Sequence, residues 1–179
     1  SQGKAEAKLD IELISQVAGQ VVEVADSFAV GGRFNQGDKL LQIDSRDYQA
    51  RLARAKGAVA TAKKELAIER GLAFQARREW KDLGNADAND LFLRKPQVSA
   101  AEAAVQAALA DVEQAQLDLQ RTTLTAPFAG RVVRIDVNLG QYLPVGKIVG
   151  RVLAPDIVEV RLPVTLRQAQ LLGLNASFG

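Results

Sequence analysis

Side chains that commonly perform chemistry are scarce in this sequence. It contains no histidine and no cysteine, so Ser-His and Cys-His nucleophile pairs are excluded, together with zinc sites built on those ligands. It also contains no methionine, which removes the soft thioether ligand for copper or silver. The glycines show neither Gly-x-Gly-x-x-Gly nor Gly-Lys-Ser/Thr spacing, the two patterns that cradle phosphate. We therefore predict no catalytic residue, no metal ligand and no cofactor.

Length and charge further narrow the class of protein. The 179 residues can hold one or two domains with a real core. Lys and Arg number 23 against 21 Asp and Glu, and no basic block is interleaved with aromatics, so a nucleic-acid partner is not expected. No stretch approaches the ~20 apolar residues of a membrane span. The chain begins Ser-Gln-Gly rather than with Met, and we expect a piece of a longer protein whose anchor or export signal lies elsewhere.

A short β motif occurs twice, on either side of a long helical segment. Ala-Gly-x-Val-Val stands at 18–22 and again at 129–133, and a glycine turn followed by an apolar strand comes after it both times, at 37–44 and from 146. A half-motif repeated across an insertion predicts one discontinuous domain. The inserted segment must then leave this domain and return to the same point.

The inserted segment has two stretches in which small and apolar residues recur every seven positions. A period of 3.5 residues sustained this long is typical of a coiled-coil seam. At 1.5 Å per residue the first helix would be a rod of roughly 57 Å, which must project from its domain. The first helix has one row of Leu52, Val59, Leu66, Ala73 and Trp80, and a second of Tyr48, Ala55, Ala62, Glu69, Ala76 and Leu83. The return helix has Val98, Val105, Val112 and Leu119, with Ala101, Ala108 and Ala115.

The composition of this seam has two consequences. Buried Ala contributes far less than the ~1.5–3 kcal/mol of a buried Leu or Val, so a lone pair of these helices would be marginal, and we predict lateral packing against other copies. Glu69 is a charged residue within the seam, and we expect it to pair with a residue of the second helix.

Turn signals mark the tip of the predicted hairpin, near 84–96. Gly84 suits the end of the first helix and Pro96 the start of the second. Between them lies the apolar triplet 91–93, which at a solvent-facing tip would suggest a contact site. Packing of the triplet on its own helices is the alternative.

The two half-motifs carry a resemblance. Gly37-Asp38-x-Leu40-x-x-Ile43-Asp44, which resumes as Ala126-Pro127-x-Ala129-Gly130-x-Val132, resembles the biotinyl/lipoyl carrier domain. A lipoyl-like domain split by a helical hairpin, with a neighbouring β-barrel, is similar to the periplasmic adaptor (membrane fusion protein) family of bacterial efflux pumps. The resemblance implies an α+β fold: a lipoyl-like β-sandwich in two halves (14–44 and 124–154), an antiparallel coiled-coil hairpin (45–123), and part of a β-barrel domain (1–13 and 155–179).

The same resemblance implies a function without catalysis. Such adaptors lie in the periplasm of Gram-negative bacteria, anchored to the inner membrane, and assemble, usually as six copies, around a conduit. Their hairpin tips meet a TolC-type outer-membrane channel, and their other domains engage an inner-membrane transporter, commonly a proton-driven RND pump. The resemblance implies export of drugs or other small molecules.

The tip departs from the family pattern. RND-type adaptors often carry Arg-x-x-x-Leu-x6-Ser for channel recognition. Here Arg78 precedes Leu83 by five residues rather than four, the tip is longer, and Arg94 takes the place of the Ser. The candidate channel-binding residues are Arg78, Leu83, Leu91, Phe92 and Arg94. The alternative for Arg78 is a solvated outer face.

Three other functions stay open. A carrier with a lipoyl or biotinyl arm would need a lysine between the halves, but Lys39 lies in the turn before a strand and the junction holds Ser-Arg-Asp at 45–47. A structural coiled-coil protein would fit the heptads but has no need to return the chain to its starting point. Within the adaptor family, an ABC or major-facilitator transporter competes with RND as the partner.

Overall fold

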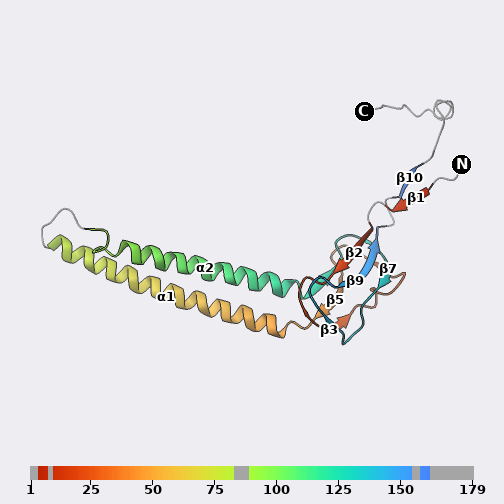
Figure 1. The fold of residues 1–179 in the computed structure, drawn as a ribbon, viewed down its shortest axis with the longest axis horizontal. Helices are drawn as coiled ribbons and strands as arrows, with labels where there is room; N and C mark the ends of the chain where they lie inside the picture. Colours follow the sequence, from red (N-terminus) through yellow and green to blue (C-terminus); the bar gives the residue numbers. More distant parts are fainter. Residues whose placement is uncertain (1–3, 8–9, 83–88, 155–157, 162–179) are drawn as a thin grey trace, which may run out of the picture.

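The computed structural model describes residues 4–7, 10–82, 89–154 and 158–161. Two long helices lie side by side and project from a small β domain, and a separate two-stranded sheet stands beyond that domain (Figure 1). In chain order the elements are β1 (Lys4–Ala7), β2 (Asp10–Ile14), β3 (Gly19–Val24), β4 (Arg33–Phe34), β5 (Lys39–Ile43), α1 (Arg46–Asp82), α2 (Lys95–Gln120), β6 (Thr123–Thr125), β7 (Gly130–Ile135), β8 (Tyr142–Leu143), β9 (Ile148–Leu153) and β10 (Val158–Arg161).

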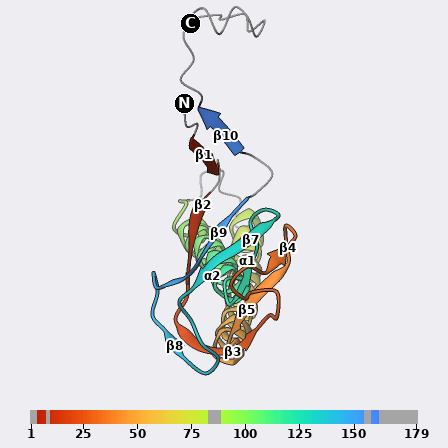
Figure 2. The same ribbon diagram turned by 90° about the vertical axis from the view of Figure 1, so that its right-hand side faces the viewer.

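The β domain consists of two four-stranded sheets, and each draws strands from both sides of the helices. One sheet has the order β2-β9-β7-β4 and the other β6-β5-β3-β8, and all the pairings are antiparallel. Figure 2 looks along the helix pair, with these sheets in front. The first sheet begins at Asp10, because β2 pairs with β9.

The two halves exchange equivalent backbone hydrogen bonds. The Gly31 N–H donates to the Val132 carbonyl at 2.8 Å, and the Gly140 N–H donates to the Val21 carbonyl at the same distance. Gly31 and Gly140 have φ values of 81° and 82°, in the left-handed region that glycine adopts readily. The repeated motif therefore closes one domain through reciprocal contacts, and neither half completes its sheets alone.

A single apolar core lies between the two sheets. Leu40, Leu143, Val149 and Val152 are fully buried, and Phe28 packs among them from the loop after β3. These residues come from both sides of the helices, four from strands and Phe28 from a loop, so the core exists only when the halves come together.

Burial along the helices follows the spacing of the predicted seam. In α1 the positions that are not fully exposed are Tyr48, Leu52, Ala55, Val59, Ala62, Leu66, Glu69, Ala73, Ala76 and Trp80. In α2 the positions predicted from 98 to 119 are likewise buried or half-buried, and α1 and α2 contact each other. The supercoiling of a coiled coil stays a prediction. Among the described residues, neither helix offers a stretch apolar enough, at the length a bilayer requires, to cross a membrane.

The bases of both helices are fastened to the β domain. The Tyr48 hydroxyl donates to the Ala18 carbonyl at 2.6 Å, and the Tyr48 ring is part of the core. At the end of α2, Leu119 packs against the same core, and the buried Thr122 hydroxyl donates to the Leu119 carbonyl at 2.7 Å. The orientation of the helices is therefore tied to the core of the domain.

Candidate partner-binding tip

The far end of the helix pair contains a compact turn that enters α2. The Asn89 side-chain oxygen accepts from the Leu91 N–H at 2.9 Å, and the Asn89 carbonyl accepts from the Leu93 N–H at 3.1 Å. The Lys95 ammonium lies 2.6 Å from the Asp90 carboxylate. This turn is therefore ordered by its own side chains, as local Asx-type bonding predicts.

The apolar residues of the turn have different environments. Leu91 is 61% exposed. Phe92 is 42% exposed, and its ring lies against Trp80 of α1 with the ring centroids 4.9 Å apart and the planes tilted by 56°. Phe92 therefore packs on the helices, whereas Leu91 faces solvent, and a contact site at the triplet stays a prediction. Leu83, the other predicted apolar residue, lies outside the described residues.

Arg94 folds back onto the seam. Its Nε and Nη2 donate to Oε2 of Glu69 at 3.0 and 2.7 Å, and the two side chains are only 33% and 23% exposed. Arg94 has a φ of 56°, a left-handed conformation that costs a non-glycine residue roughly 1–2 kcal/mol. The partner expected for Glu69 therefore exists, but it lies just before α2 rather than within that helix.

Arg78 stands apart from these contacts. It is exposed on α1, with its guanidinium 5.9 Å from the centre of the exposed Phe74 ring. Phe74 also borders a hollow across the two helices that is lined by Leu93 and Val98 together with the basic Arg70, Arg77 and Lys95.

The structure thus brings Leu91, Phe92 and Arg94 to one turn, and it anchors two of them on Trp80 and Glu69. Sequence reasoning placed both anchors in the seam without connecting them to the tip. A charged residue in the seam requires a partner of opposite charge, so Glu69 could have indicated that a basic residue such as Arg94 lies beside it. The seven-residue spacing of the helices does not predict the hollow beside Phe74.

Lys39 and the acidic residues show ordinary structural contacts. The Lys39 ammonium lies 2.6 Å from the Glu23 carboxylate, which joins β5 to β3. Throughout the described ranges, no three residues of the His, Cys, Asp or Glu type converge as metal ligands.

Two ion pairs hold the edges of the β domain. The side chain and backbone N–H of Arg46 donate to Asp44, where β5 gives way to α1, and lower the pKa of Asp44 to about 2. Hydrogen bonds from Arg151 of β9, at 2.7 and 2.6 Å, likewise lower the pKa of Asp10 in β2. Both carboxylates are ionised at neutral pH, and the pairs fix the start of α1 and the β2 edge.

The two interlocked sheets, with a long helix pair inserted between the neighbouring strands β5 and β6 of one of them, define the class of protein as a barrel-sandwich hybrid. A solved structure described as a putative efflux transporter from Bacteroides eggerthii has a TM-score of 0.69 at 24% identity, and covers 98% of this chain and 48% of that one. A MacA-MexA chimera containing the Pseudomonas aeruginosa MexA α-hairpin domain gives 0.61 at 24% identity, over 85% of this chain and 50% of that one. These likenesses concern the fold alone.

The family model described as "RND MFP, barrel-sandwich hybrid domain" matches residues 10–154. The chain therefore belongs to the membrane fusion protein family. Among relatives, the multidrug resistance protein MdtA of Proteus mirabilis is 30% identical over 169 residues, which are 94% of this chain and 40% of MdtA, so the chain spans less than half of that relative. Members of the family are adaptors and not enzymes, in agreement with the absence of catalytic residues predicted from the sequence.

Proposed function

We propose that this chain is part of a periplasmic adaptor of a drug-efflux pump. In this role the protein links an inner-membrane transporter, most consistently of the RND type, to a TolC-type outer-membrane channel and seals the conduit between them. It would act in the periplasm, anchored to the inner membrane by a segment outside this chain. The RND assignment is supported by the description of the matching family model.

The observation that carries this proposal is the position of Leu91. A leucine 61% exposed at the far end of a long helix pair, with its neighbour Phe92 packed at an angle against Trp80, is suited to contact a partner distant from the β domain. Burial of one leucine in such a contact is worth roughly 1.5–3 kcal/mol. Arg78 and Leu83 stay candidates for the same contact.

A substitution at this leucine tests the tip contact. In the full-length protein, we expect Leu91→Asp to lower drug resistance of cells that depend on it and to reduce co-purification of the channel at least tenfold. Val30→Asp is the matched control, because Val30 is an equally apolar, exposed residue of the β domain. Wild-type resistance and channel recovery with Leu91→Asp would contradict the proposed tip contact.

Self-association, in a ring of six, completes the proposal. Exposed apolar residues lie on the outer faces of both helices, as Ile68, Leu72 and Phe74 on α1 and Leu109 and Leu117 on α2. The chain has no cysteine, so single cysteines introduced at Leu72 and Leu109 report contacts between copies. We expect these two cysteines to cross-link between copies in assembled pumps, and a purely monomeric product would contradict lateral packing.

A further inference from the structure

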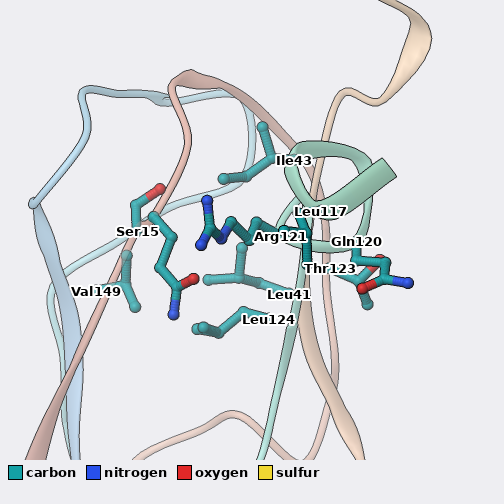
Figure 3. A pocket seen from close by; sticks show the side chains of 10 residues that line it. Ser15, Leu41, Ile43, Leu117, Gln120, Arg121, Thr123, Leu124 and Val149 are labelled. Carbon is teal, nitrogen blue, oxygen red and sulfur yellow. The ribbon is translucent and has the colours of Figure 1, made fainter. Parts of the chain in front are cut away.

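A cavity of about 190 Å³ lies where α2 meets the β domain (Figure 3). Its apolar walls come from Leu41 and Ile43 of β5, Val149 of β9, Leu124 of β6 and Leu117 of α2. Leu41, Ile43 and Val149 are buried core residues. The floor of the cavity is therefore part of the core itself.

The cavity exists because the two sheets do not close against each other at this side. β2 is an edge strand of one sheet and β6 is an edge strand of the other. The last turn of α2 lies over the gap, where Gln120 and Arg121 line the cavity. Ser15 and Gln16, just after β2, and Thr123 of β6 complete its polar rim.

Arg121 is the one charged residue that lines this cavity. Figure 3 shows its side chain directed into the space between Ser15 and Leu41. Within the described part of the chain its only ion pair is a long one, 3.3 Å to Asp118, whose carboxylate also accepts from Gln114 at 2.9 Å. A guanidinium carries five N–H donors in a planar fork that matches a carboxylate, so most of this fork is available.

We propose that this cavity binds a small aromatic carboxylate of about the size of benzoate. An apolar cavity of about 150 Å³ in a protein core accommodates benzene, so the space fits one ring but not a drug-sized molecule. The ring would lie against the accessible side chains of Leu117 and Leu124, over the buried floor of Leu41, Ile43 and Val149. The carboxylate would accept hydrogen bonds from Arg121. This site is independent of the proposed adaptor role, and such a ligand would touch both sheets and the base of α2 at once.

Titration with three probes of similar size, which share an aromatic ring and differ in charge, separates the contribution of the ring to binding from that of the carboxylate. Benzoate should produce saturable NMR shifts of the Leu41, Ile43 and Val149 methyl groups, toluene weaker ones, and benzylamine none. Arg121→Gln should weaken benzoate about tenfold, as expected for loss of a charge-assisted hydrogen bond, and should leave toluene unchanged within twofold. Arg131→Gln, at an exposed arginine of β7 that does not line the cavity, is the matched control and should change neither.

Several results would overturn the proposal. Equal shifts with benzoate and benzylamine, or unchanged benzoate binding in Arg121→Gln, would remove the guanidinium from the site. Absence of saturable shifts with any probe would mean that the cavity takes no such ligand. Leu41 methyl shifts that depend on protein concentration without a probe would show instead that a second copy fills it.

Discussion

The ion pair between Glu69 and Arg94 should stabilise the tip far more than an ordinary surface pair. Hydrogen bonds to charged groups contribute about 1.5–3 kcal/mol when protected from water, against about 0–1 kcal/mol for exposed pairs. Glu69 and Arg94 are 23% and 33% exposed and share two donor contacts. We therefore expect a coupling energy of about 1–2 kcal/mol from the double-mutant cycle of Glu69→Gln and Arg94→Gln.

The same helix pair contains a matched control. Arg70 and Glu102 also join α1 to α2, at 2.8 Å, but they are 60% and 50% exposed. Their cycle should give about 0–0.5 kcal/mol, which 1 M salt should abolish. Salt should reduce the coupling of the half-buried pair much less, because solvent ions screen it poorly.

Trp80 supplies the assay. It is the single tryptophan of the chain, and its ring lies against Phe92 in the tip turn, so its fluorescence reports unfolding of this end of the helices in urea. Amide exchange of residues 89–98 gives an independent local free energy. A Glu69–Arg94 coupling no larger than that of Arg70 and Glu102 would refute the argument from burial.

The conformation of Arg94 adds a second check on the same residue. Its φ of 56° favours glycine, so Arg94→Gly should recover about 1 kcal/mol relative to Arg94→Ala, although both lose the ion pair. Equal stability of the two variants would mean that backbone strain at this position is negligible.

Two further predictions concern the β domain. Gly150→Ala should lower the free energy of unfolding by about 1–3 kcal/mol, because the added Cβ would lie 2.7 Å from the Arg134 carbonyl oxygen and 2.9 Å from the Phe28 ring. Gly57→Ala, where nothing beyond the adjoining backbone of α1 lies within 4 Å of the new Cβ, should be neutral or stabilising in the same urea titration. Hydrogen bonds from Arg46 lower the pKa of Asp44 to about 2. The contribution of this pair to the free energy of unfolding should therefore be present above pH ~4 and lost as the pH falls towards 2. Asp44→Asn should be less stable than the parent at pH 6, with a difference that shrinks at pH 2–3, and a pH-independent difference would contradict this.

The seam was predictable because burial along a straight helix follows its periodicity. Each apolar residue from Leu52 to Trp80 in the predicted rows is at least half-buried, since positions seven apart return to the same face. The end of the seam was not predictable in this way. Arg94 reaches Glu69 only because a non-glycine residue adopts a left-handed conformation, which no spacing rule indicates.

The cavity and the reciprocal contacts of the two halves were also beyond sequence reasoning. The duplicated motif predicted two related halves, but not that Gly31 would bond to the opposite half through Val132. Likewise, the cavity depends on β2 and β6 being the outermost strands of their sheets. The residues of a strand do not reveal which of its edges stays without a neighbouring strand. Non-local geometry of this kind requires the structure.

The joint between the sheets and the helices explains how so long an insertion leaves the domain intact. β5 and β6 pair with Gln42 opposite Thr123, so the chain leaves and returns on adjacent strands, about 5 Å apart, and needs only short connectors to reach the 8–10 Å separation of packed helices. Gln42 clamps this joint, because it donates to the Thr122 carbonyl at 3.1 Å and accepts from the Thr123 hydroxyl at 2.8 Å. A hairpin of any length could stand on these two strands without disturbing the core. A swing of the helices relative to the sheets would have to break the contacts at the helix bases, which are the Tyr48 hydrogen bond to Ala18 and the packing of Leu119 on the core.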